Sequence, residues 1–168
     1  MNGQSTNRIA IQVDDRERAS VVFAALQKAP EFEITVTRLK LGDYLLDGRF
    51  LFERKTATDL AASIVSGRLF TQALRLATSA LRPTLIVEGS DDDIARTGMS
   101  WESIQGALVT VTISCGMPVL RTRTAEESVK TMLFAARQFR AQALGGLPRA
   151  GYRPRGKRAR QLYILQGL

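Results

Sequence analysis

Apolar and polar residues alternate along much of this chain with a period of two, which is typical of strands with one buried face. Six segments with this alternation, or with a short apolar run, are predicted to be strands: residues 9–13, 32–39, 44–46, 49–55, 84–87 and 117–121. Between the third and the fourth segment, Asp47-Gly48 is a strong signal for a two-residue turn. We therefore expect these two strands to form a hairpin.

Other segments place apolar residues three and four positions apart, the spacing of one face of a helix. Five such segments are predicted to be helices: residues 20–29, 59–65, 69–80, 101–115 and 124–143. The fourth stays open between helix and strand over residues 109–113, and Trp101 at its start is expected in the core. The last opens with the capping box Thr124-x-x-Glu127, and the acidic run 91–93 is expected to be a surface loop or a cap. Alternating helices and strands with one hairpin predict an α/β fold around a central mixed β-sheet.

Charge is distributed unevenly over the 168 residues, of which 45% are hydrophobic, enough for one domain with its own core. The net charge of +8 is concentrated near the C-terminus, after the break at Gly145-Gly146. Six basic and no acidic side chains lie in residues 149–160: Arg149, Arg153, Arg155, Lys157, Arg158 and Arg160. Such a basic arm favours an anionic partner, most commonly nucleic acid, although a solvated tail that aids solubility has the same composition.

The chain contains no histidine, which excludes Ser-His-Asp and Cys-His catalytic sets and His-ligated zinc. A general base must then be a carboxylate, a lysine or a metal-bound hydroxide. The single cysteine, Cys115, cannot form an internal disulfide. No segment resembles a signal peptide or is apolar for long enough to span a membrane. We therefore expect a soluble, intracellular protein without a membrane partner.

Candidate chemistry gathers around the predicted hairpin, where Asp43, Glu53 and Lys55 form an Asp-x9-Glu-x-Lys pattern. Alternate side chains of a strand share a face, so Glu53 and Lys55 are expected to point the same way. The hairpin returns the chain and can bring Asp43 close to Glu53. Two hard oxygen ligands beside an ammonium can hold a divalent cation and place water against a phosphodiester. The alternative is a charged, solvent-facing strand edge.

Three further positions carry weaker signals. The charged cluster at 13–17, which contains Asp14, Arg16 and Glu17, is either a solvated turn or a metal or phosphate contact at a strand end. Arg68 stands near a predicted helix start, where arginine and free N–H groups can bind phosphate, or simply marks the helix boundary. Asp59, taken from the residues alone, is better explained by a helix cap at Thr56-x-x-Asp59.

Several motifs agree in order and spacing with those of a known family. They are Asp14-x-Arg16-Glu17, Gly42-Asp43-Tyr44, Glu53-Arg54-Lys55-x-x-x-Asp59, Gly67-Arg68-Leu69-Phe70-x-Gln72, Ile86-Val87-Glu88-Gly89 and the terminal Gln161-Leu162-Tyr163-Ile164-Leu165. With these motifs the chain resembles the nuclease domain of the XPF family of structure-specific endonucleases over residues 8–168. Every signature position is intact, which is typical of the active rather than the silent partner in such dimers.

The resemblance implies a restriction-endonuclease-like three-layer core that hydrolyses DNA phosphodiesters with Mg²⁺ or Mn²⁺ and no small-molecule cofactor. The implied substrates are junctions of duplex and single strand, such as 3′ flaps and forks, in repair or recombination, and the implied assembly is a homodimer. The implied compartment is the cytoplasm of a prokaryote rather than a eukaryotic nucleus. Two alternatives remain: a non-catalytic DNA-binding or dimerisation subunit, and another nuclease of the same core, such as a junction resolvase.

The resemblance also assigns roles to residues. It implies that Asp14, Asp43 and Glu53 hold the metal and that Lys55 and Asp59 take part in catalysis with them. It implies that DNA binding or support of the acids falls to Arg16, Glu17, Arg54, Arg68, Gln72, Arg153, Arg155, Lys157 and Arg158. The expected organisation is a nuclease domain at 8–146, a basic linker at 147–160 and the start of a C-terminal helix at 161–168, where the family's helix-hairpin-helix modules usually begin.

Overall fold

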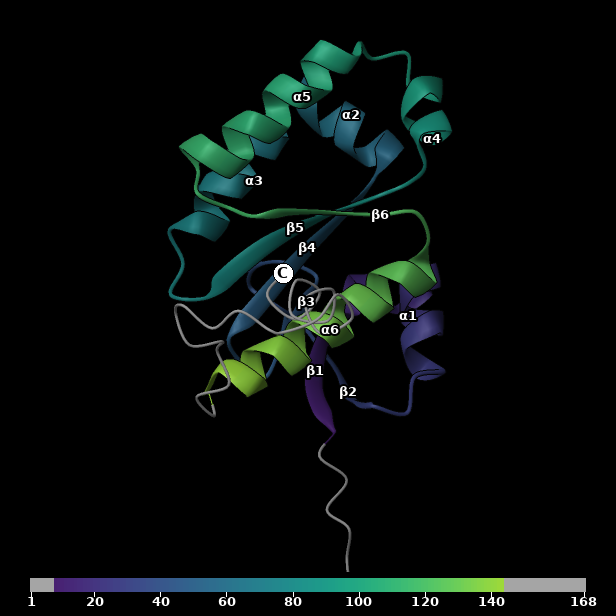
Figure 1. Ribbon diagram of the computed structural model, residues 1–168, viewed down its shortest axis with the longest axis vertical. Coiled ribbons are helices and arrows are strands. Elements are labelled where there is room, and N and C mark those ends of the chain that lie inside the picture. The colour runs from purple at the N-terminus through teal and green to yellow at the C-terminus, as the bar shows by residue number, and fades with distance from the viewer. Residues whose placement is uncertain (1–7, 144–168) are drawn as a thin grey trace, which may run out of the picture.

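A computed structural model describes residues 8–143 of the chain, and in this part six strands form one sheet (Figure 1). The strands are β1 (Ile9–Asp14), β2 (Phe32–Thr37), β3 (Tyr44–Leu46), β4 (Phe50–Thr56), β5 (Arg82–Glu88) and β6 (Val119–Thr122). Their order across the sheet is β2-β1-β3-β4-β5-β6. Strand β3 is antiparallel to both of its neighbours, and the other pairs are parallel. The predicted mixed sheet and its hairpin are confirmed.

Helices cover both faces of this sheet and complete a three-layer α/β fold (Figure 1). In the described part they are η1 (Asp15–Ala19), α1 (Val21–Gln27), α2 (Ala57–Val65), α3 (Arg68–Ala77), α4 (Asp91–Arg96), α5 (Trp101–Val109), η2 (Thr110–Ser114) and α6 (Ala125–Ala143). One core cluster packs α1 and α6 against the sheet, and the other packs α2, α3 and α5 against the opposite face. The three-layer arrangement that the resemblance implied is therefore confirmed.

Strand β4 belongs to both cores because its side chains alternate between the two faces. Phe50 and Phe52 enter the cluster under α6, whereas Leu51 enters the cluster under α3. The polar half of the strand continues this alternation, so that Glu53 and Lys55 share the α3 face. Strands β1, β4, β5 and β6 all end at the same edge of the sheet, since they run parallel. Asp14, Lys55 and Glu88 thus lie near one edge.

Three sequence predictions require correction or refinement. Of the two expectations for the acidic run 91–93, the cap is confirmed and the loop is wrong: the run forms the first turn of α4, Ser90 accepts a hydrogen bond from the Asp93 N–H, and the Asp93 carboxylate accepts from the Ser90 N–H. Trp101 is not in the core, because 68% of its surface is exposed. The segment 101–115 is helical rather than a strand, with α5 running into the single π-helical turn η2, and Ile104 and Val111 on its buried side.

Helix α6 begins after a cap that differs slightly from the expected capping box. The hydroxyl of Thr124 accepts a hydrogen bond from the Glu127 N–H at 3.2 Å, while the Glu127 carboxylate accepts from the N–H of Arg123. The predicted linker at 147–160 and the helix start at 161–168 lie outside the described residues. In residues 8–143, no helix has both the length and the apolar character needed to cross a membrane.

Candidate functional site

Asp43 is fixed between two strands just before β3 begins. Its backbone N–H donates to the carbonyl of Phe52 at 2.9 Å, and its carbonyl accepts from the Asp14 N–H at 2.8 Å. Its side-chain Oδ2 accepts from the backbone N–H of Arg54 at 2.8 Å. The Asp47-Gly48 turn folds β4 back beside β3, so the hairpin brings Asp43 to the polar end of β4 as the sequence predicted.

Gly42 makes this placement sterically feasible. Its backbone has φ +69°, a left-handed conformation that glycine adopts without strain. A Cβ atom at this position would lie 2.7 Å from the side chain of Leu51 and 3.2 Å from the Phe52 carbonyl oxygen. The Gly42-Asp43 pair therefore allows the chain to approach β4 closely and hold the carboxylate there.

We expect Gly42→Ala to reduce the free energy of unfolding by about 2–4 kcal/mol, since left-handed strain and overpacking add. The matched control is Gly48→Ala, which has a similar φ of +65° but no atom within 4 Å of the added Cβ. The control should show only the backbone cost of about 1 kcal/mol. Urea unfolding of the two variants measures the difference, and equal losses would contradict the steric role of Gly42.

Glu53 and Lys55 lie on the same face of β4, as predicted, and both are nearly buried, each with 9% exposure. Lys55 Nζ donates a hydrogen bond to Glu53 Oε1 at 3.1 Å. The alternative of a solvent-facing strand edge is therefore wrong for these two residues. Both side chains are instead buried on a strand inside the sheet, where their positions are fixed, as in a functional site.

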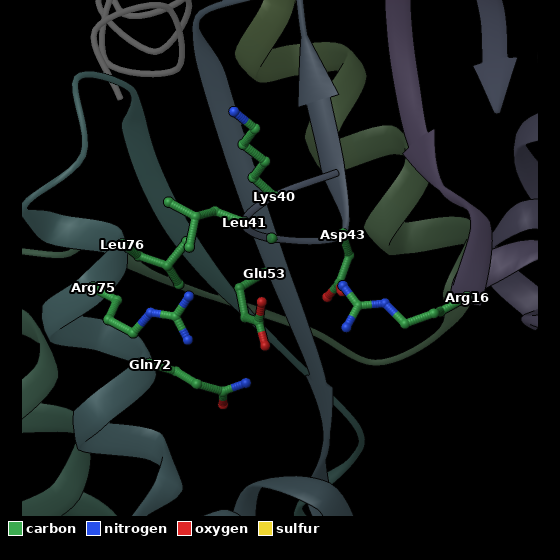
Figure 2. Close-up of a pocket in the computed structure, with 9 residues that line it drawn as sticks. Arg16, Lys40, Leu41, Asp43, Glu53, Gln72, Arg75 and Leu76 are labelled. Atoms are coloured by element: carbon green, nitrogen blue, oxygen red, sulfur yellow. The ribbon is translucent and has the colours of Figure 1, made fainter. Parts of the chain in front are cut away.

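A pocket of about 150 Å³ opens in front of these acids, and Figure 2 shows its lining side chains. Asp43 and Glu53 turn their carboxylates into the same space. Arg16 enters beside Asp43, and Gln72 and Arg75 of α3 enter from the side of Glu53. The remaining lining residues are Lys40, Leu41, Gly42 and Leu76, and Lys40 points away from the carboxylates. The pocket is thus acidic at its centre and basic at its sides.

The two carboxylates influence one another. Burial, and then the negative charge of Glu53, raise the pKa of Asp43 to about 7, although the Arg54 N–H and the Lys55 charge act in the opposite direction. A divalent cation between the two acids would remove this penalty, because it favours both ionised forms. A positive charge bound between the two carboxylates would therefore be stabilised electrostatically.

The donor set fits a hard cation. Within residues 8–143, no three or more His, Cys, Asp and Glu side chains converge closely enough to hold a metal as they stand. Asp43 and Glu53 supply two carboxylates, and Mg²⁺ is commonly bound by one or two carboxylates together with water and substrate phosphate. These two residues are the ones in the described structure that could hold Mg²⁺ or Mn²⁺ in this pocket.

The raised pKa of Asp43 makes a pH prediction for the metal-free protein. A carboxylate whose folded pKa exceeds its unfolded value stabilises the fold below the unfolded pKa, and this stabilisation is lost as the pH rises through the folded pKa. We expect the free energy of unfolding of the wild type, relative to that of Asp43→Asn, to fall as the pH rises from the usual aspartate pKa of 3.8 to the raised pKa of about 7. Urea unfolding in EDTA across this range measures the difference, and a pH-independent difference would contradict the burial effect.

Asp14 is held in a different way. It is fully buried, and its Oδ1 accepts from the backbone N–H of Arg16 at 3.0 Å and from the Arg16 Nε at 2.5 Å. Its Oδ2 accepts from the Leu39 N–H at 2.8 Å. Burial opposes ionisation, but these hydrogen bonds outweigh it and lower the pKa of Asp14 to about 2. The structure does not bring Asp14 into the pocket lining; it uses Asp14 to position Arg16.

Of the Glu-Arg-Lys-x-x-x-Asp motif, Glu53 lines the pocket, Lys55 lies next to it through its hydrogen bond to Glu53, and Asp59 and Arg54 lie away from it. Asp59 is exposed, its N–H donates to Thr56 Oγ1 at 3.2 Å, and its carboxylate accepts from the Thr56 hydroxyl at 2.6 Å, so the cap predicted from the residues is confirmed. Arg54 points to the α6 face. Its Nε and Nη2 donate to the two oxygens of Glu88 at 2.9 and 2.5 Å. Of the two roles that the resemblance gave Arg54, the contacts support bracing and not phosphate binding.

The other predicted residues take supporting positions. Glu17 accepts a hydrogen bond at 2.7 Å from the hydroxyl of Tyr44, whose ring is fully buried. Arg68 is exposed at the start of α3, where its Nε donates to Ser66 Oγ at 3.2 Å, and it is not part of the pocket lining. Gln72 lines the pocket as described. The basic residues Arg153, Arg155, Lys157 and Arg158 lie outside the described residues.

Sequence reasoning missed Lys40 and Arg75. Lys40 follows β2 in an irregular segment and carries no motif. Arg75 stands seven residues after Arg68 and three after Gln72, a spacing that places the three side chains on one side of a helix. This spacing could have drawn attention to Arg75 had the orientation of α3 been known.

Comparison with known proteins agrees with the geometry. Residues 13–134 match the family model of the ERCC4 domain. The 3′-flap repair endonuclease Xpf of Saccharolobus solfataricus is 33% identical over 133 residues, which are 78% of this chain and 56% of that protein. The DNA repair endonuclease XPF of Mus musculus is 34% identical over 85 residues, 51% of this chain and 9% of that protein. The chain thus spans about half of the archaeal relative and much less of the animal one.

Solved structures show the same fold. XPF from Aeropyrum pernix, in complex with DNA, superposes with a TM-score of 0.68 and 31% sequence identity, over 95% of this chain and 74% of that chain. A second structure of XPF from Aeropyrum pernix gives a TM-score of 0.71 with 30% identity, over 94% of this chain and 74% of that chain. The arrangement of sheet, hairpin and helices described above is therefore shared with these relatives.

Proposed function

This chain belongs to the ERCC4-domain family, that of the XPF nuclease domain, and on this premise we propose that it is a metal-dependent endonuclease that cuts DNA. The proposed substrates are junctions between duplex and single strand, such as 3′ flaps and forks, in repair or recombination. The proposed cofactor is Mg²⁺ or Mn²⁺. An intracellular location in a prokaryote stays a prediction, supported by the archaeal relative.

The observation that carries the proposal is that Asp43 and Glu53 turn their carboxylates into one pocket, with Lys55 hydrogen bonded to Glu53 beside it. Asp43 and Glu53 would hold the cation, which when bound lowers the pKa of a water and offsets negative charge that develops on phosphate. Lys55, held 3.1 Å from Glu53, would orient a water or stabilise the charge on the phosphate oxygens. The pocket lining contains no histidine, because the chain has none.

Arg16 would contribute the first phosphate contact. Its guanidinium is paired with Asp14 at 2.5 Å, yet 58% of its side chain is exposed at the pocket beside Asp43. An arginine fixed at one end by a buried acid keeps its free N–H groups directed outward, where they can donate to a phosphate oxygen. Contacts of this kind bind backbone rather than bases, so selectivity would follow from the shape and flexibility of the junction.

A homodimer is the proposed assembly. Exposed apolar side chains on α5 and η2 support it, since Trp101, Val109 and Ile113 have 68, 53 and 75% of their surface exposed. Exposed apolar side chains carried by one helical segment can contribute to an interface. Three further residues would support the site from a distance: Asp14 positions Arg16, Asp59 belongs to the cap of α2, and Arg54 braces Glu88.

The non-catalytic alternative makes a different electrostatic prediction. A module that only binds DNA gains nothing from two acids whose charges oppose each other beside a phosphate-binding surface. The raised pKa of Asp43 therefore favours the catalytic proposal.

The test is cleavage of labelled DNA. We expect the chain to cut a 3′ flap and a fork in Mg²⁺ or Mn²⁺, to cut linear duplex much more slowly, and to lose all activity in EDTA. A four-way junction in the same series separates this proposal from a junction resolvase. DNA binding without cleavage of any substrate in either metal would contradict the proposal and support the non-catalytic subunit.

A further inference from the structure

The wall of the pocket formed by α3 suggests a second contact with DNA. We propose that Arg75 binds a backbone phosphate of the strand being cut, so that the strand crosses the pocket from Arg16 on η1 to Arg75 on α3. The inference rests on the proposed function and adds to it a direction for the substrate strand and a residue to which no role has been assigned.

The guanidinium of Arg75 has a suitable position and no competing partner. It reaches into the pocket from α3 on the side of Glu53, opposite Arg16 (Figure 2). Among the described residues it forms no ion pair and no side-chain hydrogen bond, unlike Arg16, Arg54 and Arg140, each of which is paired with an acid. Its donors are therefore available to a ligand.

Gln72, one turn before Arg75 on the same helix, gives an independent indication. It lines the same pocket, and its buried side-chain oxygen Oε1 has no hydrogen-bond partner in the described structure. A buried polar atom without a partner is costly, and an apolar side chain would pack in this wall without that cost. A polar side chain kept here without an internal partner indicates that this part of α3 faces a ligand with polar groups.

Charge and geometry specify that ligand as phosphate. Two arginines flank the central carboxylates from opposite sides, and Lys40 adds a third positive charge to the lining. The planar guanidinium donates two parallel hydrogen bonds to phosphate oxygens. A cation bound by Asp43 and Glu53 would make the pocket still more positive, and a nucleic-acid backbone supplies phosphates in series on both sides of the bond that is cut.

The test compares Arg75→Gln with Arg137→Gln. Both variants lose one positive charge from an exposed helix position, but Arg137 lies on α6, across the sheet, in a loose 3.6 Å pair with Glu31. Fluorescence anisotropy with a 3′-flap DNA, in EDTA so that no cleavage occurs, measures the dissociation constant at several salt concentrations. We expect Arg75→Gln to weaken binding about tenfold and to reduce the salt slope by about 0.9, the value of one phosphate contact. Arg137→Gln should change neither quantity.

The outcomes separate the inference from the function on which it rests. Equal affinities and salt slopes for the two variants and the wild type would overturn the role of Arg75 while leaving cleavage by the wild type intact. A wild type that cuts no branched DNA would overturn the proposed function, whereas a specific loss of affinity in Arg75→Gln would still establish the phosphate contact. In the same cleavage assay, Arg75→Gln should have a KM about tenfold higher than the wild type, with a smaller change in kcat, because Arg75 would contact the backbone away from the reacting atoms.

Discussion

Asp43→Asn is expected to abolish cleavage while leaving the protein at least as stable as the wild type. The asparagine keeps the side-chain oxygen that accepts the Arg54 N–H, so the local structure should be retained. The substitution removes the negative charge that would bind the cation. It also removes the repulsion between this charge and that of Glu53. A lost metal ligand costs several kcal/mol of transition-state stabilisation, which lowers kcat/KM by about 1,000-fold.

Although Asp43→Asn lowers activity, it is expected to raise the free energy of unfolding. At pH 8 in EDTA the wild-type carboxylate is ionised against its environment, whereas asparagine is neutral at every pH. Urea unfolding under these conditions should therefore show Asp43→Asn to be more stable than the wild type. Adding Mg²⁺ should stabilise the wild type and leave the variant unchanged, because only the wild type keeps both ligands.

The control for Asp43→Asn is Asp15→Asn, which changes an exposed acid of η1 that pairs with Arg38 at 2.6 Å. It should retain both activity and stability. Lys55→Met should also lose cleavage, and Lys55→Arg should not restore it, since a guanidinium does not replace a compact ammonium at a buried position. Cleavage by Asp43→Asn at the wild-type rate would exclude the proposed metal site, and cleavage by Lys55→Met at the wild-type rate would exclude the proposed role of Lys55.

The centre of the site could be predicted from the sequence because short-range rules determine it. The Asp-Gly turn sets the register of the hairpin, and the period of two in β4 puts Glu53 and Lys55 on one face. The same period requires Arg54 to point to the other face. Of the two roles that the resemblance implied for Arg54, the strand pattern therefore favours bracing an acid over binding phosphate, as its contacts with Glu88 show.

The periphery of the site depends on long-range contacts that no local pattern contains. Asp14 stands at a strand end as expected, but its carboxylate is occupied by the N–H of Leu39, 25 residues away, and by Arg16. Arg75 reaches the pocket because α3 buries Leu69, Ala73 and Leu76 against the sheet, and this orientation of the helix about its axis directs Arg75 toward the pocket. Trp101 was expected in the core, yet the buried side of α5 begins at Ile104.

Arg54→Met is expected to destabilise the fold strongly. Arg54 and Glu88 are both nearly buried, with side-chain exposures of 11 and 9%, and two hydrogen bonds join them across β4 and β5. Ser128 of α6 donates a third hydrogen bond to Glu88 at 2.6 Å, and Thr122 is hydrogen bonded to Ser128 at 2.7 Å. Removing Arg54 leaves a buried carboxylate without its counter-charge, which costs about 3–5 kcal/mol.

Partner variants distinguish this brace from a catalytic role. Glu88→Gln should lose stability too, because it leaves Arg54 buried and unpaired, whereas the double variant Arg54→Met/Glu88→Met should recover much of the loss by replacing the ion pair with apolar groups. The control is Arg96→Met, since Arg96 pairs with Asp93 on the exposed side of α4 with exposures of 71 and 44%, and should cost less than about 1 kcal/mol.

Activity supplies the discriminating measurement. At a temperature where Arg54→Met remains folded, its KM and its salt dependence should match those of the wild type, because Arg54 points away from the pocket. An Arg54→Met protein of wild-type stability but with weaker DNA binding would show instead that this arginine contacts phosphate. The central arginine of the Glu-Arg-Lys motif would then act like Arg16 and Arg75, and the α6 face of β4 would have to be part of the DNA-binding surface.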